Sequence, residues 1–213
     1  MQTLYCLSGL GVDESAFKSF HPKNVRLVHI PWISALKNET LTHYAERLFK
    51  SSNLPENYSL IGVSFGGMIA QEFAKIQPPA SLFLVSSIQS GKQLPWGYRA
   101  GGKLRIHKII PSKLLTTTTP LSYFLFGTKK REDKRLLREI LKRTDPKFLK
   151  WAMHAILGWK NDTKHAGIVI HGSNDRILPV PLSSDYVIHG GGHFMIVTHS
   201  KQISDIVEKR FLS

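Results

Sequence analysis

Ser64 is the residue whose surroundings most clearly predict chemistry. It lies at the centre of a G-x-S-x-G pattern, residues 62–66, between an extended apolar run at 58–61 and a segment with apolar side chains at helical spacing. A serine on such a sharp turn between strand and helix presents its hydroxyl beyond the edge of the sheet. The first N–H of the helix can then stabilise a developing oxyanion. The pattern therefore predicts Ser64 as a nucleophile and the backbone N–H of Phe65 as an oxyanion donor.

A carboxylate and a histidine follow Ser64 in the sequence, each just after a predicted strand. Asp175 follows the apolar run 168–172, and His193 follows the run 186–188 and three glycines. A serine hydroxyl needs a general base, and imidazole, with an ordinary pKa of about 6.5, suits that role. A carboxylate fixes the tautomer of the imidazole and stabilises its charged form. Parallel strands bring such residues together at their carboxyl ends, so we expect Ser64, Asp175 and His193 to meet there.

The rest of the chain alternates predicted strands with predicted helices. Apolar extended runs occur at 25–30 and 81–85. One helical stripe follows Thr40, a predicted N-cap, and another follows Ser200. Alternation of this length predicts an α/β fold with a mostly parallel central sheet and helices on both faces.

These features together resemble the α/β-hydrolase fold superfamily, in the form of a compact serine esterase with a helical cap. The chain order of serine, acid and histidine is that of the superfamily. A further motif, residues 8–13, is similar to the superfamily's His-Gly-x-Gly loop, with Ser8 where histidine is common. The resemblance implies that the N–H of Leu10 is the second oxyanion donor. The chain departs from the superfamily in the spacing from Asp175 to His193, which is 18 residues where members commonly have room for a full helix, so we expect that helix to be shortened to a turn at 178–184.

The segment 91–165 interrupts the alternation. It shows no convincing strand, and several prolines separate its helical stretches. The resemblance implies that this segment is a helical cap inserted into a core made of residues 1–90 and 166–213. The segment holds 18 Lys and Arg but only 5 Asp and Glu, so +13 of the formal net charge of +14 lies within it.

Part of this charge falls on one face of a predicted amphipathic helix, opposite a leucine-rich face. The basic side chains are those of Arg131, Lys134, Arg135, Arg138 and Lys142. Two interpretations stay open: a solvated face on a helix that packs its leucines inward, or a surface that attracts a membrane or an acidic partner. The charge resembles that of carboxylesterases acting on acyl groups attached to acidic carrier proteins, such as the methyl esterase of biotin synthesis. No nucleic-acid recognition motif accompanies it, so a nucleic-acid partner is not expected.

Composition predicts a single domain in the cytoplasm. A chain of 213 residues can bury one sizeable core, and it has no apolar run of the roughly 20 residues that a membrane span needs. The start of the chain reads as a strand rather than a signal peptide, and the resemblance then implies that two leading edge strands are absent. The lone Cys6 has no partner for an internal disulfide. No metal-ligand spacing occurs, so neither a metal nor a cofactor is expected.

These residues favour hydrolysis of a carboxylic ester through an acyl-enzyme, with a small-molecule or carrier-bound acyl ester as substrate. Acyl transfer, thioester cleavage and a lyase reaction use the same three residues and stay open as alternatives. The fold also hosts proteins that only bind ligands, which is the competing class.

Overall fold

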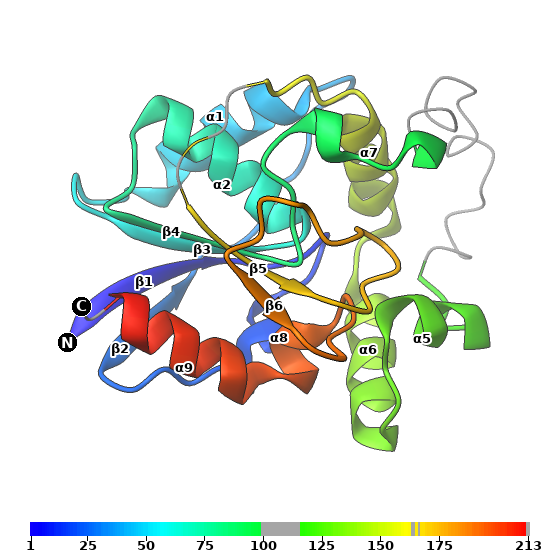
Figure 1. Ribbon diagram of the computed structural model, residues 1–213. Helices are drawn as coiled ribbons and strands as arrows, with labels where there is room; N and C mark the ends of the chain where they lie inside the picture. The colour runs from blue at the N-terminus through cyan, green and yellow to red at the C-terminus, as the bar shows by residue number, and fades with distance from the viewer. Residues whose placement is uncertain (99–115, 163–164, 166, 212–213) are drawn as a thin grey trace.

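The computed structural model describes residues 1–98, 116–162, 165 and 167–211. Within these ranges the strands form one parallel sheet in the order β2-β1-β3-β4-β5-β6 (Figure 1). The strands are β1 (Gln2–Leu7), β2 (Val25–His29), β3 (Ser59–Val63), β4 (Ser81–Val85), β5 (Ile168–Gly172) and β6 (Tyr186–Ile188). Because all pairs are parallel, the carboxyl ends of the strands lie along one edge of the sheet.

Helices cover both faces of the sheet, as the sequence predicts (Figure 1). One face carries α1 (Leu41–Ser52), α2 (Phe65–Ile76) and α7 (Pro146–Leu157); the other carries α6 (Arg131–Arg143), α8 (Met195–Thr198), α9 (Ser200–Phe211) and the short 3-10 helix η1 (Glu14–Phe17). Two smaller elements, η2 (Gly91–Gln93) and α5 (Pro120–Phe126), complete the described set. The predicted N-cap is confirmed, because the Thr40 side chain accepts the N–H of His43 at 3.2 Å. No helix in the described ranges is long and apolar enough to cross a membrane.

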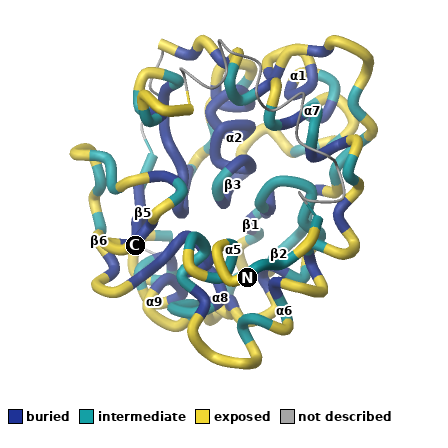
Figure 2. The backbone as a smooth tube through the Cα atoms, turned by 90° about the vertical axis from the view of Figure 1, so that its right-hand side faces the viewer, coloured by how far each residue is buried: buried dark blue, intermediate teal, exposed yellow. Residues whose placement is uncertain are grey.

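The central strand β3 is buried along its whole length, because helices cover it on both sides. Its side chains alternate between two hydrophobic clusters: Leu60 packs with α1 and α2, and Ile61 packs with α8 and α9. Figure 2 shows the buried backbone of β3 and α2 inside a shell of exposed loops. This buried centre gives the turn after β3 a rigid support.

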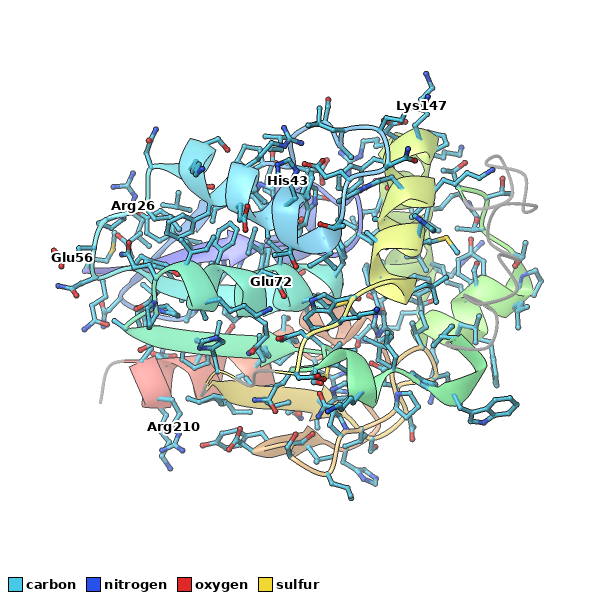
Figure 3. All side chains as sticks on the ribbon, turned by 90° about the horizontal axis from the view of Figure 1, so that it is seen from above. Arg26, His43, Glu56, Glu72, Lys147 and Arg210 are labelled. Atoms are coloured by element: carbon cyan, nitrogen blue, oxygen red, sulfur yellow. The ribbon has the colours of Figure 1, made fainter. Side chains whose placement is uncertain are left out.

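The first helical face is visible from above in Figure 3, where α1 and α2 run side by side and α7 lies across their ends. His43 on α1 and Glu72 on α2 lie along this layer, and Lys147 projects outward from α7. The α7 helix contributes Phe148, whose ring packs 6.3 Å from that of Phe65, the first residue of α2. Aromatic packing from α7 therefore reaches the element that follows Ser64.

The described part of the segment 91–165 contains helices and no strand, as predicted. Its α6 is amphipathic: Leu137 and Ile140 are buried, whereas Arg131, Arg135, Arg138 and Lys142 are exposed. Residues 99–115 and 163–164 of the predicted cap lie outside the described residues. The division of the chain into core and cap stays a prediction.

Candidate active site

Ser64 lies on a sharp turn between β3 and α2. Its backbone angles, φ 53° and ψ −116°, are strained for a residue with a side chain, at a cost of about 1–3 kcal/mol. Neighbouring groups hold this conformation: the Ser64 N–H donates to the carbonyl of Val85 at 2.9 Å, and its carbonyl accepts the Ser87 hydroxyl at 2.6 Å. The turn therefore presents the Ser64 side chain in a fixed direction at the carboxyl edge of the sheet.

Two glycines of the pattern are required by close packing of backbone on backbone. A Cβ on Gly62 would lie 2.6 Å from the carbonyl oxygen of Gly66, across the turn. A Cβ on Gly66 would overlap the carbonyl oxygens of Leu7 and Ser8 at the end of β1. The glycines thus let strand, turn and helix approach one another, and they bring the loop after β1 against the start of α2.

The structure brings Ser64, His193 and Asp175 into one hydrogen-bonded chain. The Ser64 Oγ lies 2.8 Å from His193 Nε2, and His193 Nδ1 lies 2.8 Å from Asp175 Oδ2. A carboxylate only accepts, so Nδ1 carries a hydrogen and Nε2 of the neutral ring accepts from the serine hydroxyl. His193 and Asp175 are each only 7% exposed, which limits competition from water.

Asp175 accepts hydrogen bonds at both carboxylate oxygens. The N–H groups of Ile177 and Leu178 donate to Oδ1, both at 2.9 Å, while His193 and His171 lie against Oδ2. Burial alone would raise the pKa of Asp175, but the hydrogen bonds from His171 and His193 outweigh it and hold that pKa well below its usual value. The carboxylate is therefore charged at neutral pH.

His171 is a site residue that the sequence does not reveal. Its position at the end of a strand reads as structural, whereas its Nε2 lies 3.3 Å from Asp175 Oδ2. The available signal was a polar residue within an apolar strand, four positions before the acid.

The two predicted oxyanion donors lie on facing elements, the loop after β1 and the start of α2. Among the described residues, no carbonyl or side chain accepts a hydrogen bond from the N–H of Leu10 or Phe65. The loop around Leu10 is folded by a turn in which the Val12 N–H donates to Gly9 O at 3.0 Å. Both amides are thus available for a ligand in the described structure.

Side-chain hydrogen bonds fix the shape of the loop 8–13. The Ser8 hydroxyl donates to the carbonyl of Val12, which also accepts the indole N–H of Trp32 at 3.0 Å. Because the Ser8 hydrogen is used in this way, its oxygen accepts from His29 Nε2 at 3.2 Å. Burial lowers the pKa of His29 despite the opposing charges of Glu14 and Asp13, which favours the neutral ring with its hydrogen on Nε2.

The end of α5 packs against the loop that carries His193. The ring of Phe126 meets the His193 ring edge-on, with centroids 5.8 Å apart, and its carbonyl accepts the Phe194 N–H at 3.0 Å. The same helix binds the neighbouring loop, since the Arg176 guanidinium lies 4.1 Å from the centroid of the Phe124 ring. Thus α5 contacts both the loop that carries His193 and the loop that carries Asp175.

Other reactive side chains lie away from this arrangement. Cys6 is buried within β1, and burial raises the pKa of its thiol. Among residues 1–98, 116–162, 165 and 167–211, no three His, Cys, Asp or Glu side chains cluster with the geometry of a metal site.

No family model and no curated protein sequence matches the chain. Many solved structures do match. An esterase from Exiguobacterium antarcticum aligns with a TM-score of 0.74 at 14% identity, covering 100% of this chain and 92% of its own. A thermophilic esterase from Thermogutta terrifontis gives 0.71 at 16% identity, with 99% and 89% covered. MenH from S. aureus gives 0.70 at 17% identity, with 97% and 91% covered.

These alignments extend over nearly the whole chain. The protein has the α/β-hydrolase fold. The predicted fold class is confirmed, and so is the shortened turn between acid and histidine, because residues 178–184 form no helix.

Proposed function

We propose that the protein is a serine hydrolase that cleaves a carboxylic ester through an acyl-enzyme. The observation that carries this proposal is the continuous chain of two 2.8 Å contacts from Ser64 through His193 to Asp175. Ser64 is the nucleophile, His193 the general base and acid, and Asp175 the group that orients His193. Structural neighbours described as esterases support the same class.

In the first half of the reaction, the Ser64 oxygen attacks the ester carbonyl while its proton passes to His193 Nε2. The tetrahedral oxyanion accepts hydrogen bonds from the N–H groups of Leu10 and Phe65. Collapse breaks the bond to the alkoxide, which receives the proton from His193 and leaves as an alcohol. The charged form of His193 is stabilised throughout by the Asp175 carboxylate.

In the second half, water replaces the alcohol. His193 takes one proton from the water as its oxygen attacks the acyl carbonyl, and the same two N–H groups hold the second oxyanion. Collapse releases the carboxylic acid and returns the proton to Ser64. A strong nucleophile other than water at this step would give acyl transfer by the same residues.

The basic face of α6 gives this reaction a preference for an anionic or acidic-carrier-bound acyl ester. Arg131, Arg135, Arg138 and Lys142 are exposed along the helix, and an ion pair of Arg135 with Glu139 at 3.0 Å neutralises part of the charge. A positive field of this kind accelerates the approach of an anionic partner.

Turnover of p-nitrophenyl esters of graded acyl length tests the proposal. Ser64→Ala lowers kcat by about 10⁴-fold or more, because the three residues act as a unit, while the mutant keeps its thermal stability. Ser51→Ala, on α1, is the matched control and retains full turnover. A folded Ser64→Ala protein with normal turnover, or wild-type protein that binds the esters without turnover, would contradict the proposal.

A further inference from the structure

The imidazole of His171 occupies a place that the proposed reaction does not use directly. His171 lies near the end of β5 with a fully buried side chain. Its Nε2 lies 2.6 Å from the carbonyl oxygen of Leu178 and 3.3 Å from Asp175 Oδ2. Both partners are acceptors, so Nε2 carries a hydrogen that is shared between the carbonyl and the carboxylate.

Strand packing does not account for a histidine at this position. The other ring nitrogen, Nδ1, is buried and has no hydrogen-bond partner in the described structure. An unpaired buried polar atom is destabilising, and an aliphatic side chain would fill a buried strand position without that penalty. The contacts of His171 Nε2 with Leu178 and Asp175, in the loop that follows β5, offset this destabilisation.

His171 and His193 approach the same carboxylate oxygen from different elements. His193 comes from the loop after β6, whereas His171 is fixed on the strand. The N–H groups of Ile177 and Leu178 hold the other oxygen of Asp175. A donor on the rigid strand therefore sets the plane of the carboxylate, and it competes with His193 for the charge on Oδ2.

We propose that His171 is a positioning residue that fixes the carboxylate of Asp175 and limits how strongly that carboxylate holds the imidazolium of His193. This inference rests on the proposed function. Loss of the His171 N–H leaves Oδ2 with one donor, so the carboxylate holds the charged ring of His193 more strongly. The enzyme then loses its base form at a higher pH, and the acid limb of the pH–rate profile moves upward.

Other charged groups nearby do not provide the same contact. Of the described residues, Tyr98 lies within the electrostatic influence of Asp175: burial together with the Asp175 charge raises the pKa of its phenol, so Tyr98 is neutral over the acid limb. Arg176 follows the acid in sequence, but its guanidinium donates to the carbonyl of Phe124 at 3.1 Å. His171 is thus the group whose removal changes the donors on Oδ2 without removing His193.

The test compares His171→Leu, His171→Asn and His171→Gln by kcat and KM for p-nitrophenyl acetate from about pH 4 to about pH 9. His171→Leu and His171→Asn are expected to lower kcat about tenfold, because the carboxylate that orients His193 is no longer held in place, and to leave KM nearly unchanged. The loss of the competing donor should move the acid limb up by about half a pH unit or more. Asn is too short to reach Asp175. The longer amide of Gln replaces the Nε2 donor and restores both kcat and the acid limb.

Val169→Ala is the control for a merely structural effect. Val169 is a buried residue of the same strand in the cluster under α2, so its truncation lowers thermal stability without moving the acid limb. If His171→Leu does not fold, the comparison of Asn with Gln decides.

An unshifted acid limb in His171→Leu or His171→Asn, or a Gln variant no better than Asn, would overturn the inference. Ser64→Ala measured in parallel separates this failure from that of the proposed function. Retained turnover in Ser64→Ala would refute the proposed function itself. An inactive Ser64→Ala, together with a His171→Leu variant whose kcat and acid limb match the wild type, would refute only the role of His171.

Discussion

Replacement of Gly66 by alanine should damage catalysis more than stability. Gly66 lies in the first turn of α2, and a Cβ there would lie 2.7 Å from the carbonyl carbon of Leu7 and closer still to two carbonyl oxygens. Ordinary contacts need about 3.4 Å or more, so the backbone at Leu7 and Ser8 must move by roughly 1 Å. That backbone leads directly into the loop that carries the N–H of Leu10.

The expected loss follows from that displacement. A shift of about 1 Å in a catalytic group costs about 10²-fold, and the removal of one oxyanion donor costs about 10²–10³-fold. We therefore expect Gly66→Ala to lower kcat for p-nitrophenyl acetate about 100-fold with a smaller effect on KM. Overpacking lowers the free energy of unfolding by about 1–3 kcal/mol, measured by urea denaturation.

Gly158→Ala serves as the matched control. A Cβ at Gly158 meets its nearest neighbour, the carbonyl oxygen of His154, at 3.6 Å, which is an ordinary contact, and its φ of −92° suits alanine. Its kcat should equal that of the wild type. A folded Gly66→Ala enzyme with wild-type kcat would refute the placement of the oxyanion donor in the loop 8–13.

Two further predictions concern the acid and the basic face. Asp175→Asn should lower turnover by about 10⁴-fold, the size of the effect in a serine protease, because the amide favours the wrong tautomer of His193. The lowered pKa of Asp175 in the folded state means that its stabilising contribution is present above its ordinary pKa of about 4 and is lost as pH falls below it. Denaturation curves at about pH 6 and about pH 3 should therefore show a smaller loss for Asp175→Asn than for wild type; equal losses would contradict the lowered pKa. Reversal of Arg131, Arg135 and Arg138 to Glu, or added salt, should raise KM for an anionic ester and leave kcat unchanged. Equal effects on a neutral ester would assign these arginines to a solvated face only.

The sequence predicts the elements whose patterns are local. Apolar runs locate the strands, the Thr40 cap locates the start of α1, and the glycines of the pattern 62–66 indicate a turn that only small residues tolerate. The order of Ser64, Asp175 and His193 after three parallel strands is enough to expect them at one edge, because parallel strands share a carboxyl edge.

The supporting contacts depend on pairings that no local pattern contains. Ser8 meets His29 because β1 and β2 pair with Cys6 beside His29, a register that the sequence of either strand leaves open. Phe126 meets His193 through packing between segments 67 residues apart. His171 is close to Asp175 in sequence, but its bond depends on how the turn 173–178 folds back onto β5.

Covalent labelling with a fluorophosphonate tests the central claim most directly, because this reagent reacts with a serine activated by a neighbouring base. Mass spectrometry of the digested protein should place one label on the peptide that contains Ser64. Ser64→Ala should remain unlabelled, and Asp175→Asn should react far more slowly than wild type. A label on another serine, or an unlabelled wild-type protein that still turns over esters, would contradict the assignment of Ser64 as the nucleophile.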